Sequence, residues 1–200
     1  MSKINAVCVY CGSSPGTEPV FIEAARALGK ALAAGGARVV YGGGSVGLMG
    51  ALAEAALENG GQVTGIIPEF LTRRERPRSL AQELIVTRDM HERKRLMFER
   101  ADAFVALPGG IGTLEELVEQ LTWVQLGRHQ KPILVANING YWDPLIALVE
   151  HMRAVEFVPP TYRVDFLVAD RVEQILPMLR EAARKVALAD MTLAVPADRL

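Results

Sequence analysis

The segment from Pro108 to Glu116, Pro-Gly-Gly-Ile-Gly-Thr-Leu-Glu-Glu, holds the residues that are best suited to chemistry. Three glycines among four consecutive residues cost conformational entropy, and they leave backbone N–H groups able to approach an anionic ligand. Thr113 and Glu116 stand three residues apart, as in a capping box, so Thr113 is predicted to cap a helix with Glu116 as its reciprocal partner. A capping box does not explain the glycines, so Glu116 is also a candidate for facing a ligand.

A second glycine-rich segment runs from Gly42 to Gly50, between a predicted strand and a predicted helix. Its glycines fit G-x-G-x-x-G, a pattern that binds phosphate at a helix N-terminus. An NAD site is favoured less, because the pattern follows the second strand and the acid expected about 20 residues later is missing, Glu69 being the nearest. The segment also contains G-x-S-x-G, but no histidine follows the last strand to complete a serine hydrolase. Glycines that only permit a tight turn are the structural alternative.

Charged residues cluster between Asp89 and Arg95, where a helix is predicted to begin. Asp89 is suited to cap this helix, with Glu92 at its third position. Arg93 and Lys94 are adjacent, so on a helix they point about 100° apart and cannot serve the same contact. One of them could face the sheet and hold a phosphate or carboxylate, while the other stays near the rim. A solvated basic face is the alternative.

Two further features lie near the first predicted strand. Ser13, in the loop that follows this strand, could donate its hydroxyl to a nucleotide or simply form a turn. Cys8 and Cys11 form C-x-x-C, but Cys8 falls inside the strand and no second cysteine pair is present to complete a zinc site. We therefore interpret the two cysteines as structural.

Composition and charge exclude several classes of protein. With 50% hydrophobic and 22% charged residues, the chain suits one globular domain over residues 1–200, of which 186–200 are predicted to form a C-terminal tail. A formal net charge of −1 gives no reason to expect nucleic acid or an anionic membrane as a partner. The apolar run near the N-terminus is too short for a signal peptide or a membrane span, so a cytoplasmic protein is expected.

Short apolar runs alternate with longer helical patterns along the chain. This alternation predicts an α/β fold, a three-layer Rossmann-like sandwich with a mainly parallel sheet of about seven strands. Ligands of such sheets bind at the carboxyl ends of the strands. Phe70–Ala81, rich in Arg and Pro, is predicted to be an irregular loop that could act as a lid. The predicted strands are Ile4–Tyr10, Ala37–Tyr41, Gln62–Ile67, Glu83–Thr87, Ala103–Leu107, Pro132–Ala136 and Val164–Val168, and the predicted helices are Val20–Ala34, Val46–Asn59, Met90–Arg100, Leu114–Leu126, Trp142–Val155 and Val172–Lys185.

Together these motifs resemble the LOG family of cytokinin-activating proteins, whose members are often labelled "lysine decarboxylase". The family signature P-G-G-x-G-T-x-x-E is matched at every fixed position from Pro108 to Glu116. The family's arginine-lysine element is matched by Met90–Lys94, and its glycine loop by Gly42–Gly50. The resemblance covers the chain from the first strand to about Val155, with the motifs in the family's order.

The resemblance implies a phosphoribohydrolase that cleaves the N-glycosidic bond of AMP or of a cytokinin riboside 5′-monophosphate, giving free base and ribose 5-phosphate. It implies that Arg93 and Glu116 are the catalytic pair, that no metal or organic cofactor takes part, and that homodimers carry their sites near the subunit interface. A non-catalytic carrier of a nucleotide or of the molybdenum cofactor is the first alternative function, and an NAD-dependent oxidoreductase is the second. We expect the nucleotide to be bound by Ser13, Gly42, Gly43, Gly44, Met90, Lys94, Gly109, Gly110, Ile111, Gly112, Thr113, Leu114 and Glu115.

Overall fold

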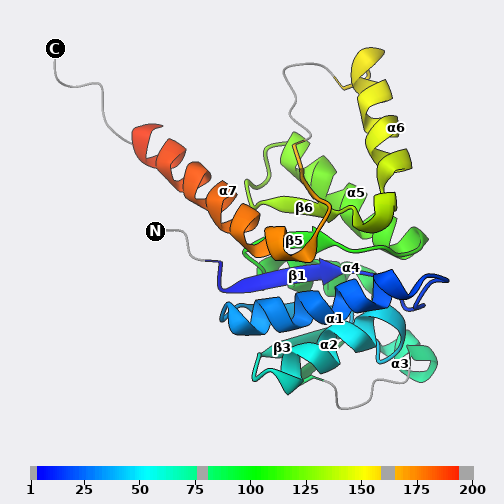
Figure 1. The fold of residues 1–200 in the computed structure, drawn as a ribbon. Coiled ribbons are helices and arrows are strands. Elements are labelled where there is room, and N and C mark those ends of the chain that lie inside the picture. The colour runs from blue at the N-terminus through cyan, green and yellow to red at the C-terminus, as the bar shows by residue number, and fades with distance from the viewer. Residues whose placement is uncertain (1–3, 76–80, 159–164, 194–200) are drawn as a thin grey trace, which may run out of the picture.

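The computed structural model describes residues 4–75, 81–158 and 165–193, and its centre is one sheet of seven parallel strands (Figure 1). The order across the sheet is β4-β3-β2-β1-β5-β6-β7. The inner strands are rich in Val, Ile and Ala, as expected of strands that are buried on both faces. The strands are β1 (Ala6–Tyr10), β2 (Arg38–Tyr41), β3 (Val63–Pro68), β4 (Glu83–Thr87), β5 (Ala103–Ala106), β6 (Ile133–Ala136) and β7 (Leu167–Ala169).

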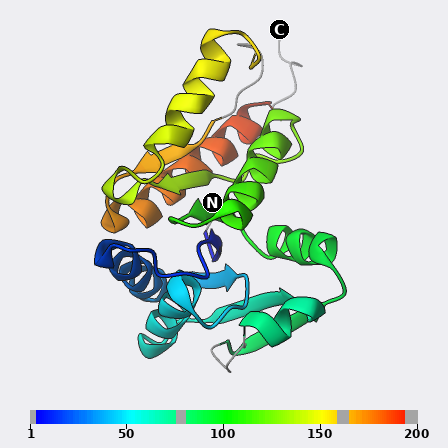
Figure 2. The same cartoon turned by 90° about the vertical axis from the view of Figure 1, so that its right-hand side faces the viewer.

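Helices cover both faces of this sheet and give the molecule three layers (Figures 1 and 2). Helices α1, α2 and α7 pack on one face, whereas α4, α5 and the start of α6 pack on the other. The far end of α6 projects beyond the sheet. The helices are α1 (Pro19–Ala34), α2 (Gly47–Glu58), α3 (Glu69–Glu75), α4 (Met90–Glu99), α5 (Ile111–Gln125), α6 (Asp143–Ala154) and α7 (Val172–Leu193), with a 3-10 turn η1 at Ile138–Gly140.

Alternate residues of β1 enter different halves of the core. Val9 joins the cluster beneath α1, α2 and α7, whereas Cys8 and Tyr10 join the cluster beneath α4 and α5. Cys11 belongs to the first cluster, so the two cysteines lie in different halves of the core; both are buried and neither is in a disulfide. Burial, together with the nearby charge of Glu116, raises the pKa of the Cys8 thiol far above its usual value. This arrangement agrees with a structural role for C-x-x-C.

Gly12 joins the loops that follow β1, β2 and β5. Its N–H donates to the carbonyl of Pro108 (3.1 Å), and its own carbonyl accepts from the N–H groups of Leu48 (3.1 Å) and Met49 (3.3 Å). A Cβ atom at Gly12 would lie 3.3 Å from the Cα of Gly109, so the two loops are in close contact. The order of the strands reverses between β1 and β5, so Gly12 lies at the switch point where such sheets bind ligands.

The predicted fold class is confirmed, but two predicted segments were wrong. Phe70–Ala81 is not one irregular loop, because α3 occupies Glu69–Glu75; residues 76–80 lie outside the described part of the chain. Phe, Leu, Arg and Glu tolerate a helix, whereas the Arg- and Pro-rich composition of the segment had favoured a loop. Helix α7 continues past Lys185 to Leu193 because Ala and Leu dominate that stretch, while residues 194–200 are not described. The predicted strand Val164–Val168 begins outside the described residues, and β7 is Leu167–Ala169.

Candidate active site

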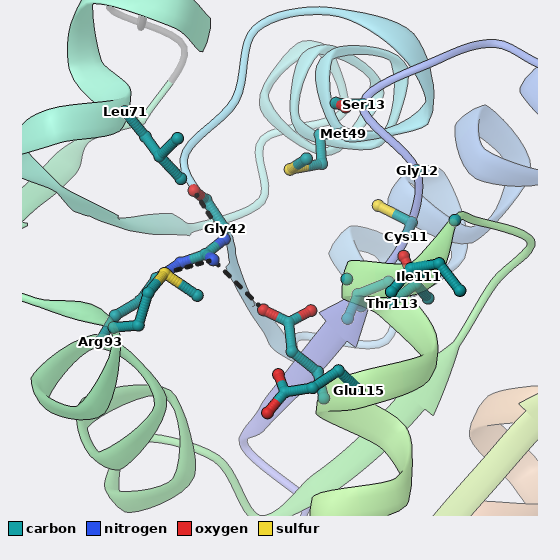
Figure 3. A pocket seen from close by; sticks show the side chains of 15 residues that line it. Cys11, Gly12, Ser13, Gly42, Met49, Leu71, Arg93, Ile111, Thr113 and Glu115 are labelled. Carbon is teal, nitrogen blue, oxygen red and sulfur yellow. Dashed lines mark hydrogen bonds and ion pairs between the residues drawn. The ribbon is translucent and has the colours of Figure 1, made fainter.

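A pocket of about 390 Å³ opens at the carboxyl ends of β1, β2 and β5 (Figure 3). Arg93 and Leu71 lie on one side of it, and Cys11, Ile111 and Thr113 lie on the other. Segments distant in sequence thus meet where a doubly wound sheet binds its ligand. The lining residues are Val9, Cys11, Gly12, Ser13, Gly42, Met49, Leu71, Met90, Arg93, Gly110, Ile111, Gly112, Thr113, Glu115 and Glu116.

Arg93 is buried at the start of α4, with only 7% of its surface exposed. Its Nε donates to the carbonyl of Ile66 (3.0 Å) and its Nη2 to the carbonyl of Gly42 (3.3 Å). Its Nη1 lies 3.3 Å from Oε1 of Glu116. Since a planar guanidinium fixes the directions of its donors, the two carbonyls orient the third donor toward the carboxylate. Arg93 is therefore built to hold Glu116.

Helix α5 presents Glu116 to the pocket, and it begins earlier than the sequence analysis predicted. Its N-cap is Gly110, without a side-chain cap, so Thr113 is the third helical residue and not the cap. The capping-box prediction for Thr113 and Glu116 is thus wrong. Glycine is disfavoured inside helices, which is why the prediction began the helix after Gly112. Glu116, 8% exposed, makes an ion pair with Arg93 and has no capping role.

The first turn of α5 forms one wall of the pocket. Among the described residues, no acceptor bonds the N–H groups of Ile111, Gly112 and Thr113, and the first of the intrahelical bonds runs from Leu114 N–H to the Gly110 carbonyl (3.1 Å). Free donors at a helix N-terminus, with the positive end of the helix dipole, favour an anion. Anion binding by these glycines stays a prediction.

At the glycine-rich segment before α2, unlike at α5, N–H groups in the first turn of the helix already bond to a protein carbonyl. The first N–H groups of α2, from Leu48 and Met49, donate to the Gly12 carbonyl, so a protein group takes the place of an anion there. Gly47 has a φ of +61°, and a Cβ on it would lie 2.4 Å from the carbonyl carbon of Ser13. Gly47 thus serves close packing, the alternative that the sequence analysis had kept for the glycines of this segment.

Lys94 does not line the pocket but pairs with Glu115, which does. Its Nζ lies 2.6 Å from Glu115 Oε1 and 2.9 Å from Glu119 Oε1. Burial opposes the charged form, but the hydrogen bonds to both carboxylates raise the pKa of Lys94 above its usual value. The lysine stays protonated, and its charge is compensated by protein side chains and not by a ligand.

The structure brings together most, but not all, of the residues expected at the site. Those outside the pocket lining are Gly43, Gly44, Lys94, Gly109 and Leu114, while the others expected do line it. The sequence analysis missed Val9, Cys11, Gly12, Met49 and Leu71. Cys11 and Gly12 stand next to Ser13 at a strand end and were in reach of the same argument. Leu71 lies in Phe70–Ala81, the segment predicted to be a loop that could act as a lid, but no feature of the sequence singled out this residue.

Over the part of the chain that the structure describes, no three His, Cys, Asp or Glu side chains gather where they could hold a metal ion. The helices there are also too short or too polar to cross a membrane.

Fold and site together define a Rossmann-like α/β protein whose ligand site combines a helix N-terminus with a buried arginine–glutamate pair. The family model described as "possible lysine decarboxylase" matches residues 49–179. The chain belongs to this family.

Curated relatives carry one common name. A probable cytokinin riboside 5′-monophosphate phosphoribohydrolase of Oryza sativa is 47% identical over 90% of this chain and 79% of its own length. The enzyme so named in Rhodococcoides fascians is 45% identical over 88% of this chain and 89% of its own length. One from Arabidopsis thaliana is 42% identical over 91% of this chain and 85% of its own length.

Solved structures of lower identity share the fold. The molybdenum cofactor binding protein of Rippkaea orientalis is 21% identical, with a TM-score of 0.68 over 90% of this chain and 98% of its own. The molybdenum cofactor carrier protein of Chlamydomonas reinhardtii is also 21% identical, with a TM-score of 0.67 over 92% of this chain and 99% of its own. At this identity the likeness concerns the fold alone.

Proposed function

We propose that this protein is a phosphoribohydrolase. It hydrolyses the N-glycosidic bond of adenosine 5′-monophosphates, including N6-prenylated cytokinin forms, to free base and ribose 5-phosphate. The observation that carries the proposal is the buried Arg93–Glu116 ion pair in the wall of a pocket that also holds the open N-terminus of α5. The names of the relatives support the same reaction.

Cleavage of an N-glycosidic bond develops positive charge on the ribose. A carboxylate beside the sugar can stabilise that cation and orient or deprotonate the attacking water, as in glycosidases. Glu116 is placed for this role, and Arg93 keeps its carboxylate in position. The amides of Ile111, Gly112 and Thr113 bind the 5′-phosphate, since they are the free donors at the helix N-terminus that faces the pocket.

The alternative functions have less support. A cofactor carrier would share this fold, but it has no need of a buried ion pair that costs desolvation energy within its pocket. An NAD-dependent oxidoreductase would bind the cofactor's pyrophosphate at a glycine-rich helix start. At α2 the donors of Leu48 and Met49 are already used by Gly12, which argues against that site.

We further propose a homodimer with its sites near the subunit interface. Exposed apolar side chains lie along α5 and α6 and just after them. One of them, Ile111, is 81% exposed and lines the pocket itself. The other exposed apolar residues of α5, α6 and the segments that follow them are Val118, Leu126, Leu148, Met152, Val155 and Phe157. Exposed apolar side chains of this kind favour a self-complementary interface, and light scattering reports the mass directly.

We also propose a single-domain protein of the cytoplasm. Cys8 and Cys11 are buried and form no disulfide, which suits a reducing compartment.

Chromatographic detection of released base tests the reaction. The panel is AMP, GMP, CMP and N6-isopentenyl AMP, with adenosine and N6-isopentenyl adenosine as unphosphorylated controls. Release of adenine or its prenylated form from the 5′-phosphates alone is the expected result. Binding of AMP without any release would instead favour a carrier, and the rank order of the substrates gives the base preference.

A methyl group at Gly42 is expected to displace Arg93. The Cβ atom would lie 2.2 Å from Arg93 Nη2, and the guanidinium cannot withdraw without losing its bond to Ile66. Since a 1 Å displacement can cost about 10²-fold in rate, we expect Gly42→Ala to lower kcat/KM for AMP by at least about tenfold. Steady-state kinetics on a variant with wild-type circular dichroism is the measurement. Wild-type turnover in that folded variant would contradict the proposed role of Arg93.

Thr113→Val separates substrate binding from helix capping. Thr113 is 4% exposed, lines the pocket and does not cap α5. Loss of its hydroxyl is expected to raise KM for AMP about three- to tenfold, the worth of one hydrogen bond, with the melting temperature within about 3 °C of wild type. Kinetics and thermal unfolding measure both. An unchanged KM with a stability loss of about 1 kcal/mol would point to capping instead.

A further inference from the structure

Tyr141, which no sequence motif singled out, contacts the turn that leads into α5. Its hydroxyl donates to the carbonyl of Gly109 at 2.5 Å. Its ring lies edge-on to Phe21 (5.5 Å between centroids) and to Trp142 (5.0 Å). Tyr141 itself does not line the pocket but a second cavity of about 400 Å³ beside it. It therefore reaches the active site only through the main chain.

The turn before α5 has three successive carbonyls, each with its own donor. The Pro108 carbonyl accepts from Gly12 N–H, and the Gly110 carbonyl accepts from Leu114 N–H, both at 3.1 Å. The carbonyl between them, that of Gly109, accepts from Tyr141. Of the three donors only this one is a side chain, so a single substitution can remove it while the main-chain bonds remain.

This hydrogen bond fixes the direction of one amide. In a trans peptide the carbonyl of Gly109 and the N–H of Gly110 point in opposite directions, and no peptide in the described chain is cis. Gly110 lines both cavities, whereas Tyr141 lines only the second. With its carbonyl held on the Tyr141 side, the peptide directs the Gly110 N–H toward the active-site pocket. A Cβ at Gly110 would meet nothing within 4 Å, whereas one at Gly109 would lie 2.8 Å from Gly12 N, so packing holds the Gly109 end of this peptide and leaves the Gly110 end open.

Hydrogen bonds in the turn that follows β6 fix the position of Tyr141. The Oδ1 of Asn137 accepts from Trp142 N–H (2.8 Å), and its Nδ2 donates to Asp143 Oδ1 (2.8 Å). The side chain of Asn137 is thus bonded through both the oxygen and the nitrogen of its amide, directly after β6. A rigid turn beside β5 holds the tyrosine against the glycine turn.

We propose that Tyr141 is a positioning residue for phosphate binding: its hydroxyl orients the Gly109–Gly110 peptide so that the Gly110 N–H joins the donors at the start of α5. The inference rests on the proposed function only in taking the bound anion to be the substrate's 5′-phosphate. Loss of the hydroxyl should weaken binding of the phosphate. It should leave the rate at which the glycosidic bond is cleaved, and the position of Glu116, unaffected.

Tyr141→Phe is the test, because it keeps the ring against Phe21 and Trp142 and removes only the hydroxyl. The expected result is a KM for AMP raised about three- to tenfold, as for one lost hydrogen bond, with kcat within about twofold of wild type. Inhibition by the two products distinguishes an effect on binding of the phosphate end of the substrate from an effect on binding of the base. The inhibition constant of ribose 5-phosphate should rise by the same factor as KM, and that of adenine should not change.

Other outcomes overturn the proposal. A lower kcat at unchanged KM, or equal weakening of adenine and ribose 5-phosphate, would mean that Tyr141 acts on the whole site. If the wild-type protein releases no base, the proposed function fails, but calorimetric titration with AMP still tests the tyrosine. Equal dissociation constants for wild type and Tyr141→Phe in that titration would then refute its role.

Discussion

Replacing Glu116 with glutamine is expected to lower kcat/KM for AMP by at least about 10²-fold, with most of the loss in kcat. Glutamine keeps the size of the side chain but has no negative charge to stabilise the ribosyl cation and no basic oxygen to take a proton from water. Glu116 does not cap α5, so its loss should leave the helix intact. Base release followed by chromatography, with circular dichroism of the same sample, gives both quantities.

Glu119→Gln is the matched control, because it makes the same chemical change one turn further along α5. Glu119 pairs with Lys94, which retains Glu115 as a second partner, and it does not line the pocket. We expect activity within about twofold of wild type for this variant. Equal turnover of folded Glu116→Gln and Glu119→Gln would remove Glu116 from the mechanism.

Arg93→Ala is expected to reduce both activity and stability. The substitution leaves the buried carboxylate of Glu116 and the carbonyls of Ile66 and Gly42 without their guanidinium partner. Breaking a buried ion pair in this way costs about 3 kcal/mol, which for a chain of this size lowers the melting temperature by roughly 6–12 °C. The displaced carboxylate should lower kcat/KM by at least about 10²-fold. Thermal unfolding and steady-state kinetics measure the two effects.

Arg95→Ala controls for the loss of a positive charge on α4. Arg95 forms an exposed pair with Glu99, a contact worth no more than about 1 kcal/mol, so both activity and melting temperature should stay near wild type. In a double-mutant cycle, Arg93→Ala should cost much less activity in a protein that already carries Glu116→Gln. Fully additive losses would show that Arg93 acts on the substrate and not through Glu116.

The sheet and its order of layers could be predicted because their signals are local. Strands such as β5 and β6 are continuous apolar runs, and each is followed by a helical pattern that ends at glycine or a polar residue. The start of α5 could not be predicted in the same way, because glycine is a poor helix former. Ile111, Gly112 and Thr113 nevertheless belong to the helix. The turn that precedes them is held by hydrogen bonds to Gly12 and Tyr141, which come from other parts of the chain.

The directions of the side chains were the second feature that could not be predicted from the sequence. By residue type alone, adjacent Arg93 and Lys94 were equivalent candidates, and the family resemblance singled out Arg93. The packing of α4 shows that Arg93 faces the sheet while Lys94 meets Glu115 and Glu119. Leu71 enters the site through a short helix whose composition suggested a loop. Motif residues could therefore be identified in advance, whereas their neighbours depend on tertiary contacts.

The main-chain hydrogen bonds of Gly12 limit how the site can move. Because the peptide groups of Gly12 bond to the loop after β5 and to Leu48 and Met49 in the first turn of α2, none of these three segments can open without breaking a main-chain bond of another. They are expected to open as one cooperative unit and not by separate fraying. The base of the pocket should then stay ordered when the pocket is empty, so little conformational entropy remains to be lost when a nucleotide binds.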